Sequence, residues 1–123
     1  MLRVDQLTGA PAPLQADGAA MVAARCHLAD GVLSRLVGLL CTPDLRAEEA
    51  LWITRCASVH TFALRAPIGV AFVDRDGVVL RVVDPLPAWR AAGARGAVAA
   101  VELRAGVLRD AGVAPGTRLS RRA

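Results

Sequence analysis

An Asp-Gly pair between two runs of branched apolar residues is the strongest constraint on how this sequence can fold. Residues 70–74 (VAFVD) and 78–83 (VVLRVV) are rich in Val, and residues 75–77 (RDG) separate them. Asp-Gly suits a tight hairpin turn because Gly adopts positive φ angles without steric cost. The pattern therefore predicts an antiparallel hairpin, in which Asp74 and Asp76 bond to the turn backbone through their side chains.

Short apolar segments elsewhere in the chain predict more strands around this hairpin. They combine branched or large apolar residues with flanking Gly, Pro or charged residues, as is typical of strands. We expect these strands at residues 21–27, 49–55, 97–103 and 118–120. Residues 1–20 are rich in Pro and Gly and predict turns that join short extended pieces. Residues 84–96 predict a loop, and residues 56–62 fit either a strand or a loop.

Two segments predict short helices. Asp30 is a good N-cap, and apolar residues repeat at three- and four-residue spacing through residues 32–40. Pro43 prevents this helix from continuing. The second helix is expected at residues 105–111, closed by Gly112 in the left-handed conformation of a C-terminal cap.

The predicted strands and helices do not alternate along the chain. Five or six strands with two short helices predict an α+β fold, built on a mainly antiparallel sheet or a partial barrel. The length of 123 residues fits a single domain spanning residues 1–123. Because 54% of the residues are hydrophobic and only 3% aromatic, we expect a core filled by Val, Leu and Ala.

The compartment is predicted from what the sequence lacks. No apolar run approaches the ~18–20 residues of a membrane-spanning helix. Residues 1–20 lack the order of charged, apolar and small residues that marks a secretory signal. A cytoplasmic protein is therefore predicted, with a leader already removed from the N-terminus as the open alternative.

The basic residues disfavour a nucleic-acid partner. The net charge is +4, and every basic side chain is Arg. The arginines are spread along the chain and cluster only at residues 118–122, and no aromatic residues interleave with them to stack on bases.

Several short motifs occur in a fixed order. They are Ser34-Arg35-x-x-Gly38-Leu39-Leu40, Cys56-x-Ser58-Val59-His60-Thr61-Phe62, Arg65-x-Pro67-Ile68-x-Val70-Ala71-Phe72-x-Asp74-x-Asp76-Gly77, Pro87-x-Trp89-Arg90, Val101-Glu102-Leu103-x-x-Gly106, and Gly116. Over residues 20–120 this order and spacing resemble the domain of unknown function 192 family, also called uncharacterised protein family 0127. The resemblance implies a compact, β-rich single domain found in bacteria and archaea, and it implies no particular reaction.

Two positions depart from the pattern of that family. Relatives usually carry Asp where this chain has Gly69, and many carry Gly-Asp where it has Gly116-Thr117. If either acidic residue served a shared chemistry, this chain has lost it. The departures therefore weigh against an enzyme that depends on these carboxylates.

Cys56 and His60 are the pair of residues that most strongly suggests a reactive site. A thiol beside an imidazole could act as an activated nucleophile, or the two groups could be metal ligands. In an extended segment the two side chains share a face but lie ~13 Å apart, whereas a turned segment would bring them together. The alternative is a buried Cys and a His that bonds to backbone. An enzyme is therefore the less favoured interpretation, and we expect no catalytic residue.

The sequence predicts no metal and no cofactor. Cys26, His27 and Cys41 are the remaining Cys and His residues, and their spacing matches no zinc-binding pattern. The odd cysteine count and the absence of Cys-x-x-Cys also disfavour disulfides, so reduced thiols are expected. No glycine-rich phosphate loop or nucleophile elbow is present.

A binding site is the favoured functional interpretation. The candidate residues are Arg35, His60, Phe62, Arg65, Trp89 and Glu102. The arginines could clamp an anion through their guanidinium groups, or pair with Glu102. Trp89, in a Pro-rich segment, fits either a packed lid or an exposed contact.

We therefore expect a binding or accessory module, in which a groove lined by His60, Phe62, Arg65 and Trp89 holds a peptide or a small anionic ligand. The alternative is a hydrolase or transferase that uses Cys56 and His60. A third interpretation is a domain that contacts a protein partner through an exposed apolar surface.

Overall fold

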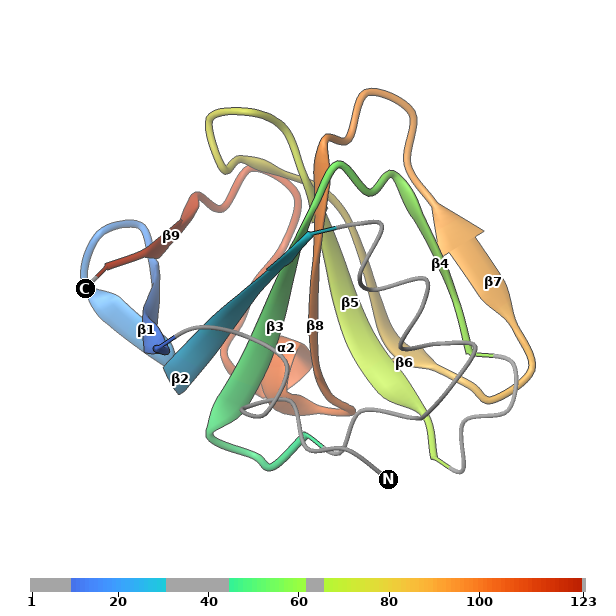
Figure 1. The fold of residues 1–123 in the computed structure, drawn as a ribbon, viewed down its shortest axis with the longest axis horizontal. Helices are drawn as coiled ribbons and strands as arrows, with labels where there is room; N and C mark the ends of the chain where they lie inside the picture. The colour runs from blue at the N-terminus through green and yellow to red at the C-terminus, as the bar shows by residue number, and fades with distance from the viewer. Residues whose placement is uncertain (1–9, 31–44, 62–65, 123) are drawn as a thin grey trace.

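The computed structural model describes residues 10–30, 45–61 and 66–122. These residues form mostly β-structure with one short helix (Figure 1). The elements are β1 (Ala12–Ala16), β2 (Ala20–Asp30), β3 (Glu49–Thr54), β4 (Ser58–His60), β5 (Ile68–Val73), β6 (Val79–Leu86), β7 (Ala91–Gly93), β8 (Ala99–Arg104), α2 (Val107–Asp110) and β9 (Leu119–Arg121).

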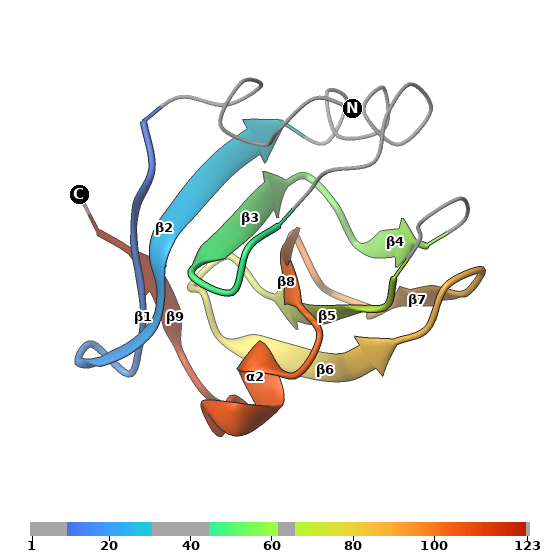
Figure 2. The same ribbon diagram turned by 90° about the horizontal axis from the view of Figure 1, so that it is seen from below.

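Seven strands form one curled sheet, in the order β6-β5-β8-β3-β2-β1-β9. The pair β2–β3 is parallel and the other neighbouring pairs are antiparallel. Figure 2 shows the sheet curving into a half-barrel, with α2 against its open side. The remaining strands, β4 and β7, pair with each other in a separate two-stranded ribbon.

The two ends of the curled sheet meet where β6 and β9 begin. The Leu119 N–H donates to the Gly77 carbonyl oxygen at 2.8 Å, and the Val79 N–H donates to the Thr117 carbonyl oxygen at 2.8 Å. Val78 and Arg118 form an isolated antiparallel bridge between these bonds. A short seam of backbone hydrogen bonds therefore joins the end strands of the half-barrel.

The curled sheet is apolar on both faces. The barrel face packs a large cluster of small aliphatic residues, as the composition predicts: Leu14, Ala16, Val22, Ala23, Cys26, Ala50, Ala71, Val73, Val79, Ala99, Val101, Leu103, Leu108, Val113 and Leu119. The opposite face, called the ribbon face, packs against Val59 of the β4–β7 ribbon through Val70, Phe72, Leu86 and Ala100. Burial on both faces explains why β5 and β8 read as nearly continuous apolar runs.

The predicted hairpin is confirmed as β5 and β6. The Asp74 carboxylate accepts the N–H groups of Asp76 and Val78, at 2.8 and 3.0 Å. Gly77 adopts φ of 82°, which the Asp-Gly pair predicts. The strands expected near residues 21–27, 49–55, 97–103 and 118–120 are also present, with bounds shifted by a few residues.

Other parts of the prediction were wrong. Five or six strands were expected and nine are present among the described residues. Residues 84–96 were predicted to be a loop, but β6 continues to Leu86 and β7 occupies residues 91–93. Asp30, predicted to cap a helix, is the last residue of β2. The rest of that expected helix, at residues 31–44, lies outside the described residues.

The second predicted helix is confirmed in shortened form as α2, with Gly112 in the left-handed conformation. The described part of the chain therefore has one short helix where the sequence predicted two in the whole chain. Among the described residues, no helix is long and apolar enough to cross a membrane.

Candidate functional site

Glu102 is a carboxylate on the apolar ribbon face of the sheet. It lies in β8 between Leu51 of β3 and Val70 of β5, its neighbours on the adjacent strands. The side chain is half-buried and makes no ion pair or hydrogen bond with another described residue. Burial raises the pKa of the Glu102 carboxyl from 4.5 to about 7. Arg35 and Arg65, the partners that the sequence suggested for Glu102, lie outside the described residues, so this pairing stays a prediction.

A buried His–Glu pair lies on the same face, and the sequence did not predict it. His27 Nε2 lies 3.3 Å from Glu49 Oε2, and the two side chains are 0% and 2% exposed. The other carboxylate oxygen of Glu49 accepts the Arg46 N–H at 3.1 Å. The parallel register of β2 and β3 creates this contact by placing His27 beside Leu51, two residues beyond Glu49. The pair therefore ties β2 to the start of β3.

The β4–β7 ribbon has one buried and one exposed side. In β4, Val59 packs into the cluster on the ribbon face, whereas Ser58 and His60 are exposed. His60 pairs with Ala91, the first residue of β7. His60, a predicted binding residue, therefore lies on the exposed side of the ribbon at the end nearest the segment before β7.

Thr61 holds the segment that carries Trp89. Its N–H donates to the Arg90 carbonyl oxygen at 2.7 Å, and its carbonyl oxygen accepts the Trp89 N–H at 3.1 Å. Its buried hydroxyl donates to the Pro87 carbonyl oxygen and accepts the Arg90 N–H at 2.9 Å. These bonds fix the loop at residues 87–90 against the end of β4. The sequence prediction missed this role, although Thr61 lies between two predicted binding residues, His60 and Phe62.

Trp89 is exposed although its backbone is held tightly. The side chain is 63% exposed, and the residue has φ of 61°. Trp89 is therefore exposed and is not buried as a packed lid. We call His60, Thr61, Trp89 and Arg90 the ribbon-end site.

The predicted site residues fall into three groups. The structure brings His60 and Trp89 to one end of the ribbon, through the bonds that Thr61 makes. Glu102 lies in the sheet beneath the ribbon face, and no described contact joins it to the ribbon-end site. Arg35, Phe62 and Arg65 lie outside the described residues, so their part in the groove stays a prediction.

The cysteines give no support to a thiol enzyme. The Cys56 thiol is half-buried, packs against apolar clusters, and donates to the Ser58 carbonyl oxygen at 3.1 Å. Burial raises the pKa of the Cys26 thiol to about 12, which opposes thiolate formation. Cys41 lies outside the described residues. Within the described ranges, no three His, Cys, Asp or Glu side chains converge as a metal site would require.

Residues 13–121 match the family described as DUF192, an uncharacterized ACR family. The chain belongs to the DUF192 family. The resemblance expected from the motifs is thereby confirmed over nearly the whole chain.

Two solved structures share this DUF192 fold. A protein of unknown function from Novosphingobium aromaticivorans DSM 12444 is 22% identical, with a TM-score of 0.72; the match covers 88% of this chain and 83% of that one. A candidate transcription regulator from Sinorhizobium meliloti 1021 is 21% identical, with a TM-score of 0.66; the match covers 78% of this chain and 80% of that one. No curated protein sequence is significantly similar to the chain.

Proposed function

We propose that the protein is a small binding module whose ligand contacts the ribbon-end site. The observation that carries this proposal is the exposure of Trp89 in a left-handed backbone conformation. Large residues rarely adopt positive φ, and doing so costs about 1 kcal/mol or more. The Thr61 hydrogen bonds stabilise this backbone conformation, in which the indole is exposed. Such strain at an exposed aromatic residue supports a contact with a ligand.

The residue types around Trp89 indicate the ligand class. Trp and Arg are the residues most enriched where binding energy is concentrated, because they combine a large apolar surface with hydrogen-bonding groups. Arg90 is exposed beside Trp89, and His60 is exposed on the adjacent strand. A guanidinium and an imidazole both suit an anionic group. We therefore propose a short peptide or small molecule that carries a carboxylate or phosphate next to an apolar group.

The test is a titration followed by ¹H–¹⁵N NMR. The probes are N-acetyl-leucine, phenyl phosphate and a tripeptide with a free carboxylate, added at constant ionic strength. We expect saturable shifts of the Trp89 indole and of the Thr61 and Ala91 amides with at least one probe. Trp89→Ala should weaken that binding at least tenfold, since it removes the exposed indole.

Two further variants separate the positioning of Trp89 by Thr61 from the contact between the Trp89 indole and the ligand. Thr61→Val keeps the shape of the side chain but removes the hydroxyl that bonds Pro87 and Arg90. It should weaken binding although Trp89 is intact. Met21→Ala is the control, because Met21 is 58% exposed and lies in β2, away from the ribbon. Unchanged binding by Trp89→Ala, or no saturable shift with any probe, would contradict the proposal.

A further inference from the structure

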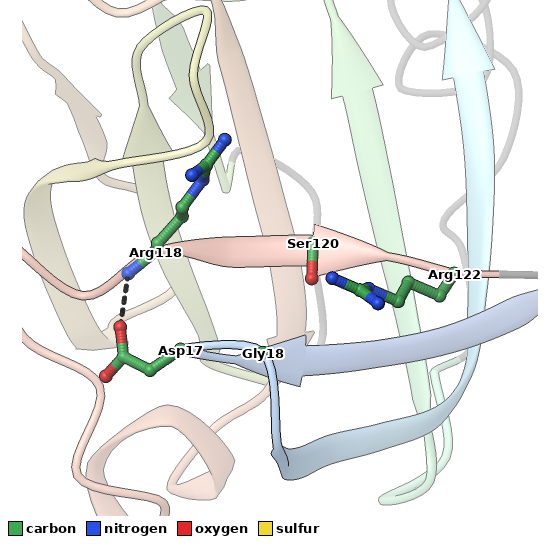
Figure 3. Close-up of a pocket in the computed structure, with 5 residues that line it drawn as sticks. All are labelled: Asp17, Gly18, Arg118, Ser120 and Arg122. Carbon is green, nitrogen blue, oxygen red and sulfur yellow. Dashed lines mark hydrogen bonds between the residues drawn. The ribbon is translucent and has the colours of Figure 1, made fainter.

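Strand β9 presents alternate side chains to the two sides of the sheet. Leu119 is buried in the barrel cluster, and the Arg121 guanidinium bonds the carbonyl oxygens of Cys26 and Ala10, both at 2.7 Å. Ser120, which lies between them, and Arg122, which follows, therefore project on the opposite side, as the period of two requires. There they line a hollow of about 410 Å³ together with Asp17, Gly18 and Arg118 (Figure 3). We call these five residues the β9 hollow.

The backbone of the β9 hollow is held at both ends. The Arg118 N–H donates to Asp17 Oδ1 at 3.0 Å, and the Asp17 N–H donates to the Arg118 carbonyl oxygen at 2.7 Å. At the other end, the Arg122 N–H donates to the Pro13 carbonyl oxygen at 2.9 Å. The wall of the hollow is thus fixed by the pairing of β9 with β1 and with the turn at Asp17 and Gly18.

The donors in the β9 hollow outnumber its acceptors. Figure 3 shows the Arg122 guanidinium reaching back along β9 to lie beside the Ser120 hydroxyl. Neither group has an ion pair or side-chain hydrogen bond with another described residue. Arg118 adds a second guanidinium at the rim, where its Nε bonds the Asp76 carbonyl oxygen at 3.0 Å. The one carboxylate, Asp17, already accepts the Arg118 N–H.

We propose that the β9 hollow is a binding site for the phosphate group of a small molecule, held by the Arg122 guanidinium and the Ser120 hydroxyl. A guanidinium presents two parallel N–H groups that match two phosphate oxygens, and the hydroxyl donates to a third. The hollow lies within the size range of small-molecule sites, roughly 300–1,000 Å³. Figure 1 shows β9 and the β4–β7 ribbon on opposite sides of the molecule, so this site is separate from the ribbon-end site.

The experiment follows backbone amides by ¹H–¹⁵N NMR in the full chain. Inorganic phosphate and phenyl phosphate are titrated at constant ionic strength, with benzoate as the probe that keeps the ring but replaces the phosphate. We expect saturable shifts at Gly18, Ser120 and Arg122 with both phosphates and weaker shifts with benzoate. Shifts that are equal for benzoate and for the two phosphates would overturn the proposal, since they would report a general attraction of anions.

Variants identify the groups that bind. Arg122→Ala should weaken phenyl phosphate binding at least tenfold. The affinity of Arg122→Lys should lie between those of Arg122→Ala and the natural protein, because Lys keeps the positive charge but lacks the two parallel N–H groups. Ser120→Ala should weaken binding about threefold. Arg95→Ala is the matched control, since it removes an exposed Arg from the turn after β7. Equal losses with Arg122→Ala and Arg95→Ala would contradict the assignment.

A final titration distinguishes a small phosphate-bearing ligand from a nucleic acid. A single-stranded oligonucleotide also offers phosphates, and its binding would depend on many arginines at once and fall steeply with salt. If the oligonucleotide binds and neither small phosphate does, the proposed small-molecule site is wrong.

Discussion

Glu102 has a measurable consequence for stability. The folded protein holds the proton of this carboxyl up to a pKa of about 7, whereas the unfolded chain releases it near 4.5. The free energy of unfolding should therefore be highest below pH 4.5 and fall as the pH rises to about 7. Each pKa unit corresponds to 1.36 kcal/mol, so the loss is at most about 3 kcal/mol.

Glu102→Gln removes this titration while keeping a similar shape. We expect the variant to be more stable than the natural protein by about 1–3 kcal/mol at pH 8, with the difference shrinking toward pH 4.5. Urea denaturation of both proteins between pH 4.5 and 8 measures it. Glu48→Gln, at an exposed position, is the control for the loss of one carboxylate charge from the surface. A constant difference for Glu102→Gln would show that burial does not perturb this carboxyl.

Gly69 is explained by the residue opposite it. A Cβ atom at this position would lie 2.9 Å from Cγ of Asp84, on the neighbouring strand β6. The Asp84 carboxylate accepts the N–H groups of Gly106 and Arg109, at 2.7 and 2.9 Å, at the start of α2. The carboxylate expected at position 69 from the family resemblance would occupy the same space as that of Asp84.

A double-mutant cycle tests this relation. Gly69→Asp should destabilise the protein by roughly 2–4 kcal/mol, because it crowds two carboxylates. Asp84→Ala should cost about 1–2 kcal/mol, through the loss of two N–H partners. The double variant should lose less stability than the sum of the two single losses, since the carboxylate that Gly69→Asp introduces can occupy the space that Asp84→Ala vacates. Chemical denaturation of the four proteins measures the coupling, and additive losses would contradict the explanation.

At the scale of elements, local chemistry predicted some parts and long-range pairing determined others. The hairpin β5–β6 was predictable because its turn carries Asp-Gly between Val-rich runs. Strand β7 was missed because Ala91, Ala92 and Gly93 have weak strand preference and form a strand only by pairing with β4. Strand β6 was cut short in the prediction because Pro85 normally disfavours a strand, yet it lies within this end strand of the sheet.

In the candidate site too, the sequence predicted some residues, whereas long-range pairing determined which of them lie together. His60 and Trp89 were predicted as residue types suited to binding, and their proximity follows from Thr61, which bonds across nearly thirty residues of chain. The His27–Glu49 contact could not be predicted, because it depends on the parallel register of β2 and β3. A buried His or Glu within an otherwise apolar strand was the available signal, since such groups are usually paired.

At the scale of the whole molecule, the seam between β6 and β9 joins the two end strands of the half-barrel. Gly77 lies in this seam and combines two constraints, a φ of 82° and close contact with the opposite strand. A Cβ atom at position 77 would lie 2.4 Å from the Leu119 carbonyl oxygen, and the Gly77 carbonyl oxygen accepts the Leu119 N–H. Any side chain here must therefore push the two ends of the half-barrel apart.

Gly77→Ala should lower the free energy of unfolding by roughly 2–4 kcal/mol, from backbone strain and from loss of the seam. Gly112→Ala is the matched control: its φ is 71°, but no atom lies within 4 Å of the added Cβ, so only strain of about 1 kcal/mol is expected. Chemical denaturation gives the two losses, and hydrogen exchange at the Val79 and Leu119 amides reports the seam directly. If both variants lose the same stability and both amides stay protected, the half-barrel does not depend on its closure at Gly77.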